Sequence, residues 1–142
     1  MATTLVSTIK KLSSNARKIK IDGKKKTDKR QRGDLAEDLA LAFLKKNGFK
    51  LIQRNFNCKL GELDLIMQDQ DYLVFVEVRH RKSNQFGGAL ESITVSKQNK
   101  LRRAAEVYLQ SIKNHDSPCR FDILCLTGCL SKPDFQWIKD AF

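Results

Sequence analysis

The sequence predicts an α/β protein in which helices pack on a mixed sheet. Two segments, at residues 34–46 and 96–112, repeat apolar side chains at the helical period, and five shorter apolar runs suit strands. In chain order the elements are a helix, three strands, a helix and one or two strands. The chain of 142 residues, 41% of them hydrophobic, fits a single folded domain with a real core.

The first 32 residues differ in composition from the rest. They hold eight Lys and three Arg against Asp22 and Asp28, and so carry most of the net charge of +11. We expect residues 1–32 to form a disordered basic tail that adds nonspecific affinity for phosphates, before a folded domain at 33–142. An amphipathic basic helix, a membrane-surface helix or an import peptide stays open, because apolar residues recur there at helical spacing: Leu5, Ile9, Leu12, Ala16 and Ile19.

The composition excludes several classes of protein. No run reaches the ~20 apolar residues of a membrane helix, and the N-terminus lacks the hydrophobic segment of a secretory signal. We therefore expect a cytoplasmic protein with no membrane partner.

The four cysteines form no Cys-x-x-Cys pair, which favours largely buried free thiols, although Cys125 and Cys129 have a separation compatible with zinc.

The first helix is predicted to begin at Gly33 and Asp34, with the Asp34 side chain as its cap. Asn47 and Gly48 supply its C-terminal stop. Glu37 has two interpretations that spacing alone leaves open. It completes a capping box with Asp34, or its carboxylate points toward acidic groups of the sheet as a further metal or water ligand.

The first strand is expected at 49–56, followed by a turn at 57–59. A β-hairpin comes next, and the rest of the chain is organised around it. Alternating apolar residues at 63–67 give its first strand, and a nearly continuous apolar run at 72–78 gives its second. The polar residues 68–71 between them suit a short turn.

The register of this hairpin decides which side chains meet. With the turn centred on residues 70–71, Asp64 faces Glu77 and Glu62 faces Arg79, all on one side of the sheet. Opposed Cβ atoms lie about 4.5–5.5 Å apart, so the two carboxylates repel each other and are costly to desolvate. A divalent cation between them removes that cost, and oxygen ligands favour Mg²⁺ or Mn²⁺. In the alternative interpretation, this end of the hairpin is exposed and the acids are simply solvated.

The second half of the chain completes the sheet. Residues 82–88 include paired glycines and are expected to form a flexible loop, either an entrance for substrate or ordinary surface. Ser96 is expected to cap a second helix that continues to Ile112. A fourth strand is predicted at 119–127 and a short closing strand at 135–142.

Basic side chains gather around the end of the hairpin and the second helix. Glu91 alone opposes them in this window of the sequence, and Lys97, Lys100 and Arg103 share one polar face of the helix. This face is either solvated surface or a track for the phosphates of a nucleic acid. The cluster consists of Arg79, Arg81, Lys82, Lys97, Lys100, Arg102 and Arg103.

An Asp, a Glu on the neighbouring strand and a cation two residues beyond that Glu form a pattern suited to phosphodiester cleavage. We expect Asp64 and Glu77 to hold a metal that binds the scissile phosphate and activates water. Arg79 would stabilise negative charge in the transition state. Glu62 either pairs with Arg79 and orients it, or supports the metal ligands from behind.

These residues resemble the PD-(D/E)xK nuclease superfamily, whose restriction-endonuclease-like mixed sheet has the core order αβββαβ. More closely, the chain from Gly33 to Phe142 resembles the YraN family of bacterial predicted endonucleases, which are similar to archaeal Holliday-junction resolvases. The blocks that carry the resemblance are Gly33 with Glu37, Arg54-Asn55, Gly61 to Ile66, Val74 to Arg79, Ser96-Lys97-Gln98, Arg120-Phe121-Asp122 and Trp137 to Phe142.

The resemblance implies that Glu37, Asp64 and Glu77 are acidic active-site and metal-binding positions in a nuclease-like domain. Arg79 then occupies the place of the superfamily's lysine, where an arginine stabilises charge but cannot act as a general base. Auxiliary basic and polar positions fall at the start of the second helix. The predicted nucleic-acid-binding residues are Lys97, Gln98, Arg81, Lys82, Lys100 and Arg103.

We expect a Mg²⁺- or Mn²⁺-dependent endonuclease that acts on DNA rather than RNA, with branched junction DNA as a candidate substrate. Cutting both strands of a junction implies a homodimer. The alternative is a nucleic-acid-binding module whose nuclease fold has lost catalysis, which predicts DNA binding that survives Asp64→Ala. A third hypothesis is a protein or membrane-surface interaction through residues 1–32, which deletion of that segment would identify.

Overall fold

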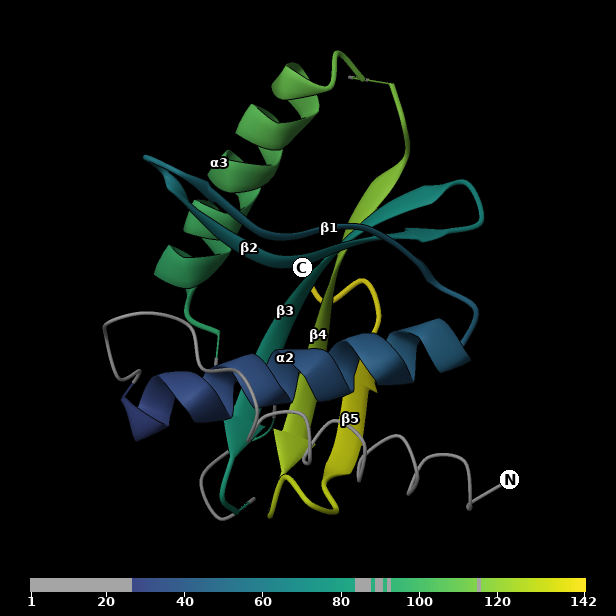
Figure 1. Ribbon diagram of the computed structural model, residues 1–142. Helices are drawn as coiled ribbons and strands as arrows, with labels where there is room; N and C mark the ends of the chain where they lie inside the picture. Colours follow the sequence, from purple (N-terminus) through teal and green to yellow (C-terminus); the bar gives the residue numbers. More distant parts are fainter. Residues whose placement is uncertain (1–26, 84–87, 89–90, 92, 115) are drawn as a thin grey trace, which may run out of the picture.

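One five-stranded sheet lies between two helices that cover its opposite faces (Figure 1). The computed structural model describes residues 27–83, 88, 91, 93–114 and 116–142, so the predicted helix at 5–19 and loop residues 84–87 lie outside the described residues. The predicted core order of helix, three strands, helix and strand is confirmed. The elements are α2 (Asp28–Lys46), β1 (Lys50–Cys58), β2 (Gly61–Asp69), β3 (Tyr72–Arg81), α3 (Val95–Ser111), β4 (Cys119–Thr127) and β5 (Asp134–Ile138).

β3 occupies the middle of the sheet, whose strand order is β1-β2-β3-β4-β5. It pairs antiparallel with β2 and parallel with β4, and the other neighbouring strands are antiparallel. Every residue from Leu73 to Glu77 is buried. The nearly continuous apolar run of this strand follows from its position, because helices cover it on both faces.

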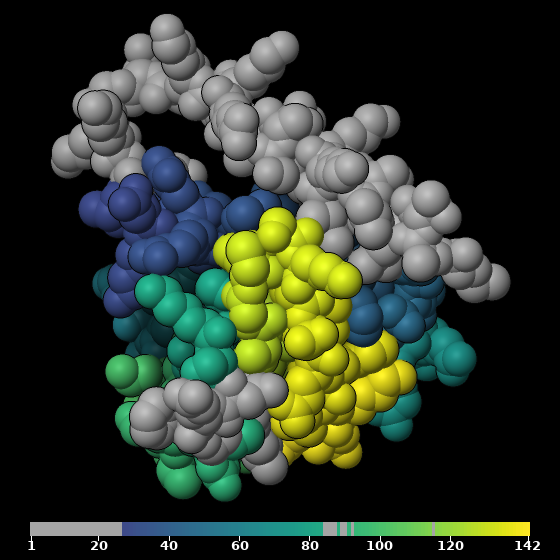
Figure 2. Space-filling view, turned by 90° about the horizontal axis from the view of Figure 1, so that it is seen from below, coloured from purple at the N-terminus to yellow at the C-terminus, as the bar shows by residue number. Residues whose placement is uncertain are grey.

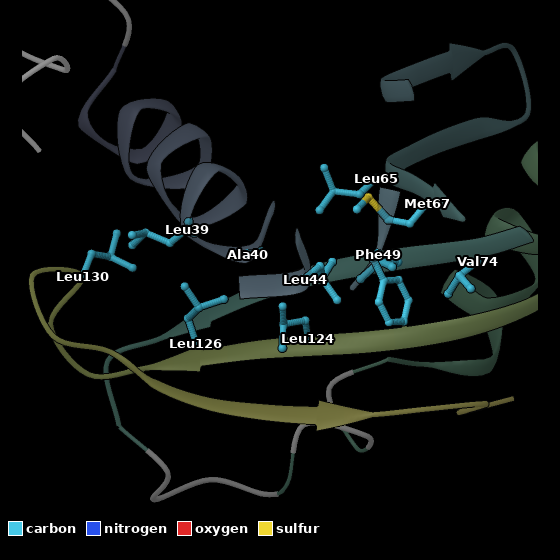
Figure 3. Close-up of a cluster of buried hydrophobic side chains, with 12 residues drawn as sticks. Leu39, Ala40, Leu44, Phe49, Leu65, Met67, Val74, Leu124, Leu126 and Leu130 are labelled. Atoms are coloured by element: carbon cyan, nitrogen blue, oxygen red, sulfur yellow. The ribbon is translucent and has the colours of Figure 1, made fainter. Parts of the chain in front are cut away.

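Each helix buries an apolar stripe against its own face of the sheet. On one face, Leu39, Ala40 and Leu44 of α2 pack over alternate strand residues such as Leu65 and Leu126 (Figure 3). Each large apolar side chain buried in this way contributes about 1.5–3 kcal/mol. The second core contains Ile66, Phe75 and Ile123 under Leu101, Ala104, Ala105 and Tyr108 of α3.

The turn between β4 and β5 extends the first core. Leu130 in this turn packs with Ala36 and Leu39 of α2. Figure 2 shows the turn, in yellow-green, beside the purple first turns of that helix.

Within the described ranges, no helix is long and apolar enough to cross a bilayer.

α2 begins earlier than the sequence predicts. It starts at Asp28, so the prediction that Asp34 caps the helix is wrong, and the expected boundary before Gly33 falls inside α2. The residues between Asp28 and Gly33 are Lys, Arg and Gln, which are good helix formers and carry the helix through this glycine. Glu37 therefore lies well inside the helix and cannot complete a capping box. The predicted end of the helix at Asn47 is confirmed.

The start of α3 and the end of β5 also differ from the prediction. Thr94 caps α3, because its hydroxyl accepts the Lys97 N–H at 3.2 Å, so Ser96 is not the cap. β4 has its predicted bounds. β5 ends at Ile138 instead of continuing to Phe142.

The cysteines are free thiols, as predicted, but most of them are not buried. Cys125 is buried, Cys58 is half-buried, and Cys119 and Cys129 are exposed. The expectation of largely buried thiols is therefore wrong. Cys58 is the last residue of β1, which moves the predicted turn at 57–59 to residues 59–60.

A buried ionic network joins the last residues of the chain to the sheet. Asp122 is fully buried and accepts hydrogen bonds from Arg120 Nε at 2.9 Å, Trp137 Nε1 at 3.1 Å and the Asp140 N–H at 3.0 Å. Arg120 also donates to Asp69 at 2.8 Å. A buried carboxylate is tolerated only when it is paired in this way. The fold itself therefore explains why these polar residues occur together.

Candidate active site

β2 and β3 separate at the point where the acidic residues lie. Their ladder has the predicted register and ends with Leu65 opposite Val76. Beyond this pair, β2 stays paired with β1, whereas β3 stays paired with β4 as far as Arg81. Figure 1 shows β1 and β2 running toward α3 while β3 and β4 continue past α2. Asp64 and Glu77 are the next residues on the two strands, so they lie where this fork opens.

The fork has local causes in the β1–β2 hairpin. Asn55 of β1 has φ +50°, which interrupts the extended backbone close to the end of the β2–β3 ladder. Gly61 lets the tip of the hairpin approach α3 closely. A Cβ at Gly61 would lie 3.0 Å from the Lys100 carbonyl oxygen and 3.5 Å from the Ala104 Cβ. Together the two positions allow β1 and β2 to bend away from β3.

Asp64 accepts a hydrogen bond from a backbone N–H of β3 beyond the end of the β2–β3 ladder. Its Oδ2 accepts the Val78 N–H at 2.9 Å. The pKa of this half-buried carboxyl is raised to about 8, first by burial and then by the negative charge of Glu77, against the opposing effect of the Val78 hydrogen bond. The carboxylates of Asp64 and Glu77 are thus close enough to repel each other.

The two oxygens of Glu77 have different surroundings. The side chain is 5% exposed, and its Oε1 lies 3.1 Å from Lys97 Nζ and 3.3 Å from Arg79 Nε. The Arg79 contact is an ion pair without the alignment of a hydrogen bond. Among the described residues, the buried Oε2 has no hydrogen-bond partner. A buried carboxylate oxygen without a donor is costly, and a bound cation or water removes that cost.

α2 brings a third carboxyl group toward the fork. The Glu37 side chain is 18% exposed. Burial is the largest cause of its raised pKa, which the positive charge of Arg54 opposes. The charge of Glu37 also contributes to the raised pKa of Asp64. The earlier start of α2 excludes the capping-box interpretation of Glu37. The other interpretation, in which its carboxylate points toward the acidic groups of the sheet, remains.

Arg79 and Glu62 do not form the predicted ion pair in the described part of the chain. The β2–β3 ladder ends before these residues, so Glu62 lies opposite Asn57 of β1 and is exposed. Arg79 contacts Glu77 on its own strand instead. Its positive charge therefore acts at Glu77 Oε1, and Glu62 does not orient it.

The predicted nucleic-acid contacts divide into three groups. Lys97 reaches the site through its ion pair with Glu77. Gln98 instead donates its side-chain amide to the Ile93 carbonyl at 3.3 Å and fixes the start of α3. The remaining four are exposed or half-buried at the end of β3 and along α3: Arg81, Lys82, Lys100 and Arg103.

The acids do not form a ready three-carboxylate metal site. Within the residues that the structure describes, no group of three or more Asp, Glu, His or Cys side chains is arranged to hold a metal ion. The pair of Asp64 and Glu77 does fit a cation, because its charges repel each other and one buried oxygen of Glu77 has no donor there. Glu37 lies within electrostatic range of this pair.

Arg54 and Asn55 of β1, for which no role was predicted, both act on Glu37. Arg54 Nη2 lies 3.7 Å from Glu37 Oε2, and its Nη1 lies 2.7 Å from Asp38 Oδ1. The Asn55 side chain lowers the pKa of Glu37, as Arg54 does. The available signal was an adjacent Arg and Asn inside an otherwise strand-like run, which is also one of the blocks that carry the family resemblance.

Comparison with known proteins places these residues in a family. The model of the uncharacterised protein family UPF0102 matches residues 36–126. A UPF0102 protein of Nitrosococcus oceani is 46% identical over 114 residues, which cover 80% of this chain and 92% of the relative. One of Stutzerimonas stutzeri is 48% identical over 111 residues, which cover 78% of this chain and 92% of the relative. One of Legionella pneumophila is 45% identical over 113 residues, which cover 79% of this chain and 94% of the relative. The chain therefore belongs to the uncharacterised protein family UPF0102.

Proposed function

We propose that the protein is a divalent-cation-dependent endonuclease that hydrolyses phosphodiester bonds of DNA. The observation that carries this proposal is the carboxylate pair at the fork. Burial and the charge of Glu77 raise the pKa of Asp64 to about 8. Among the described residues, Glu77 Oε2 has no hydrogen-bond partner. A Mg²⁺ or Mn²⁺ ion held by oxygen ligands relieves both costs.

The residues around this pair suit the cleavage of a phosphodiester. When bound, a divalent cation supplies an activated water and positive charge at the scissile phosphate. Asp64 and Glu77 would hold it, with Glu37 contributing from α2. Arg79 and Lys97 fix Glu77 through its Oε1 and add positive charge that stabilises a phosphate group. An arginine side chain cannot act as a general base, so Arg79 is not given that role.

The basic face of α3 supports DNA as the substrate. Lys97 contacts the acidic pair from the first turn of α3, and Lys100 and Arg103 are exposed further along the same helix. Such a row of cations can follow the phosphates of a nucleic acid outward from the cleavage point. The resemblance to resolvase-like proteins makes junction DNA the first substrate to test, with a homodimer as the form that cuts both strands.

A DNA-binding module without catalysis is the second candidate. Two observations favour it. Glu77 is already paired with Lys97 and Arg79, and the described residues contain no three-ligand metal group. A protein of this kind would bind DNA with strong salt dependence and would leave the phosphodiester bonds intact.

Cleavage of a labelled four-way junction and a matched linear duplex separates the two candidates. Wild type, Asp64→Asn and Asp71→Asn are incubated with Mg²⁺, Mn²⁺ or EDTA. Asp71 is an exposed acid in the turn of the same hairpin, so it controls for the loss of one negative charge. We expect cation-dependent products from wild type and Asp71→Asn, and none from Asp64→Asn. Binding without products selects the binding module, and the absence of both refutes both candidates.

A further inference from the structure

One guanidinium group of β1 contacts two neighbouring carboxylates of α2. Arg54 Nη1 lies 2.7 Å from Asp38 Oδ1, and Nη2 lies 3.7 Å from Glu37 Oε2. The Arg54 side chain is 32% exposed, and its Nε is buried without a hydrogen-bond partner among the described residues. Partly exposed ion pairs contribute little to stability, and an unpaired buried donor costs free energy. Stability alone is therefore a weak explanation for this arrangement.

Asn55, the next residue of β1, reaches the same carboxylate of Glu37. Its side chain lowers the pKa of Glu37, against the larger effect of burial. Successive side chains of a regular strand point to opposite faces, so Arg54 and Asn55 would not both reach one carboxylate. The left-handed backbone of Asn55, at φ +50°, breaks this alternation, and Asn adopts that conformation more readily than most residues. The irregularity thus brings two donors to Glu37.

The charges around Glu37 would otherwise drive its side chain away from the fork. Asp34 and Glu62 raise its pKa by repulsion, and Asp64 interacts with it in the same way. A glutamate at the edge of a helix can adopt another rotamer and turn to solvent. Arg54 lies opposite the residue that follows Asp64 in β2. β1, whose side chains act on Glu37, is therefore paired directly with β2, which carries Asp64.

We propose that Arg54 and Asn55 are positioning residues that hold the Glu37 carboxylate beside the fork, where its negative charge strengthens the binding of the divalent cation by Asp64 and Glu77. They contact neither the cation nor the DNA, and act through Glu37. The inference rests on the proposed function for its chemistry. Its main test measures cation binding directly and so does not require cleavage.

Mn²⁺ titration calorimetry on variants of the full-length chain tests the inference. Asn55→Gly removes the amide but keeps the left-handed backbone, because glycine adopts positive φ freely. Arg54→Gln removes the guanidinium charge. Asp38→Asn is the matched control, because Asp38 contacts Arg54 at 2.7 Å but is not among the charges that shift the pKa of Asp64. We expect Mn²⁺ affinity about 10-fold weaker in the two β1 variants, with lower kcat, unchanged KM for DNA, and wild-type behaviour of the control.

A Glu37→Gln background separates positioning from a general structural effect. If Arg54 acts through Glu37, adding Arg54→Gln to Glu37→Gln should weaken Mn²⁺ binding no further. Additive losses, or wild-type Mn²⁺ affinity in Arg54→Gln and Asn55→Gly, would overturn the positioning role. A wild type that binds Mn²⁺ but cleaves no DNA refutes the proposed function and leaves this test valid. A wild type that binds no Mn²⁺ overturns the inference itself.

Discussion

Replacing Asp64 by Asn should stabilise the protein in the absence of divalent cations. In the folded protein the pKa of Asp64 is about 8, against an ordinary value of 3.8. The folded state therefore binds this proton more tightly than the unfolded state does. The stability that results is fully present below about pH 4 and is lost as the pH rises toward about 8. Asn is neutral at every pH and can still accept the Val78 N–H.

The size of the effect follows from the same pKa values. The difference between 3.8 and about 8 corresponds to at most ~6 kcal/mol. Solvent at the half-buried site and the shared repulsion with Glu77 reduce this to roughly 1–3 kcal/mol at pH 8. For a domain of this size, such a gain raises Tm by about 3–10 °C.

Urea unfolding in EDTA at pH 5 and pH 8 measures the free energy of unfolding. We expect Asp64→Asn to exceed wild type at pH 8, and by a smaller margin at pH 5, whereas Asp71→Asn follows wild type. Added Mn²⁺ should stabilise wild type but not Asp64→Asn, because a ligand stabilises the state that binds it. An Asp64→Asn protein that is no more stable than wild type at pH 8 would refute the reasoning.

Three further substitutions test other parts of the structure. Gly61→Ala should lower the free energy of unfolding by about 1–3 kcal/mol, because its Cβ would lie 3.0 Å from a backbone oxygen of α3; unchanged urea stability would contradict this contact. Lys97→Gln should reduce the slope of log K for DNA binding against log[salt] by about 1, as measured by fluorescence anisotropy. An unchanged slope would mean that DNA does not contact Lys97. Asp122→Asn should cost roughly 1–3 kcal/mol, because it removes the buried charge that accepts hydrogen bonds from Arg120, Trp137 and the backbone of residue 140, while Arg120 keeps its second anionic partner; a melting temperature near wild type would contradict that.

The hairpin register could be predicted because it depends on a short local turn. The polar residues around Gln70 and Asp71 place the turn, and side-chain alternation then fixes which residues of β2 and β3 are opposed. The strand bounds of β4 follow in the same way from one continuous apolar run. The start of α2 could not be predicted, because Gly33 resembles a boundary while the helix formers before it continue the helix.

The candidate site could be predicted only in part. The proximity of Asp64 and Glu77 follows from the register, but the end of the ladder at Leu65 does not. The fork depends on the left-handed backbone of Asn55, which interrupts a strand-like run, and on the approach of the hairpin tip to α3, which is a contact between distant parts of the chain. For this reason the predicted pairing of Glu62 with Arg79 fails.

The initial rate of Mn²⁺-dependent junction cleavage by Glu77→Gln tests the central claim most directly. This variant keeps the shape of Glu77 and removes the charge from the carboxylate whose Oε2 has no donor among the described residues. With wild type and Asp71→Asn assayed on the same DNA, we predict a fall of roughly 100-fold or more in Glu77→Gln alone. Equal cleavage by all three proteins would contradict the claim that the fork is the cation-binding site of a nuclease.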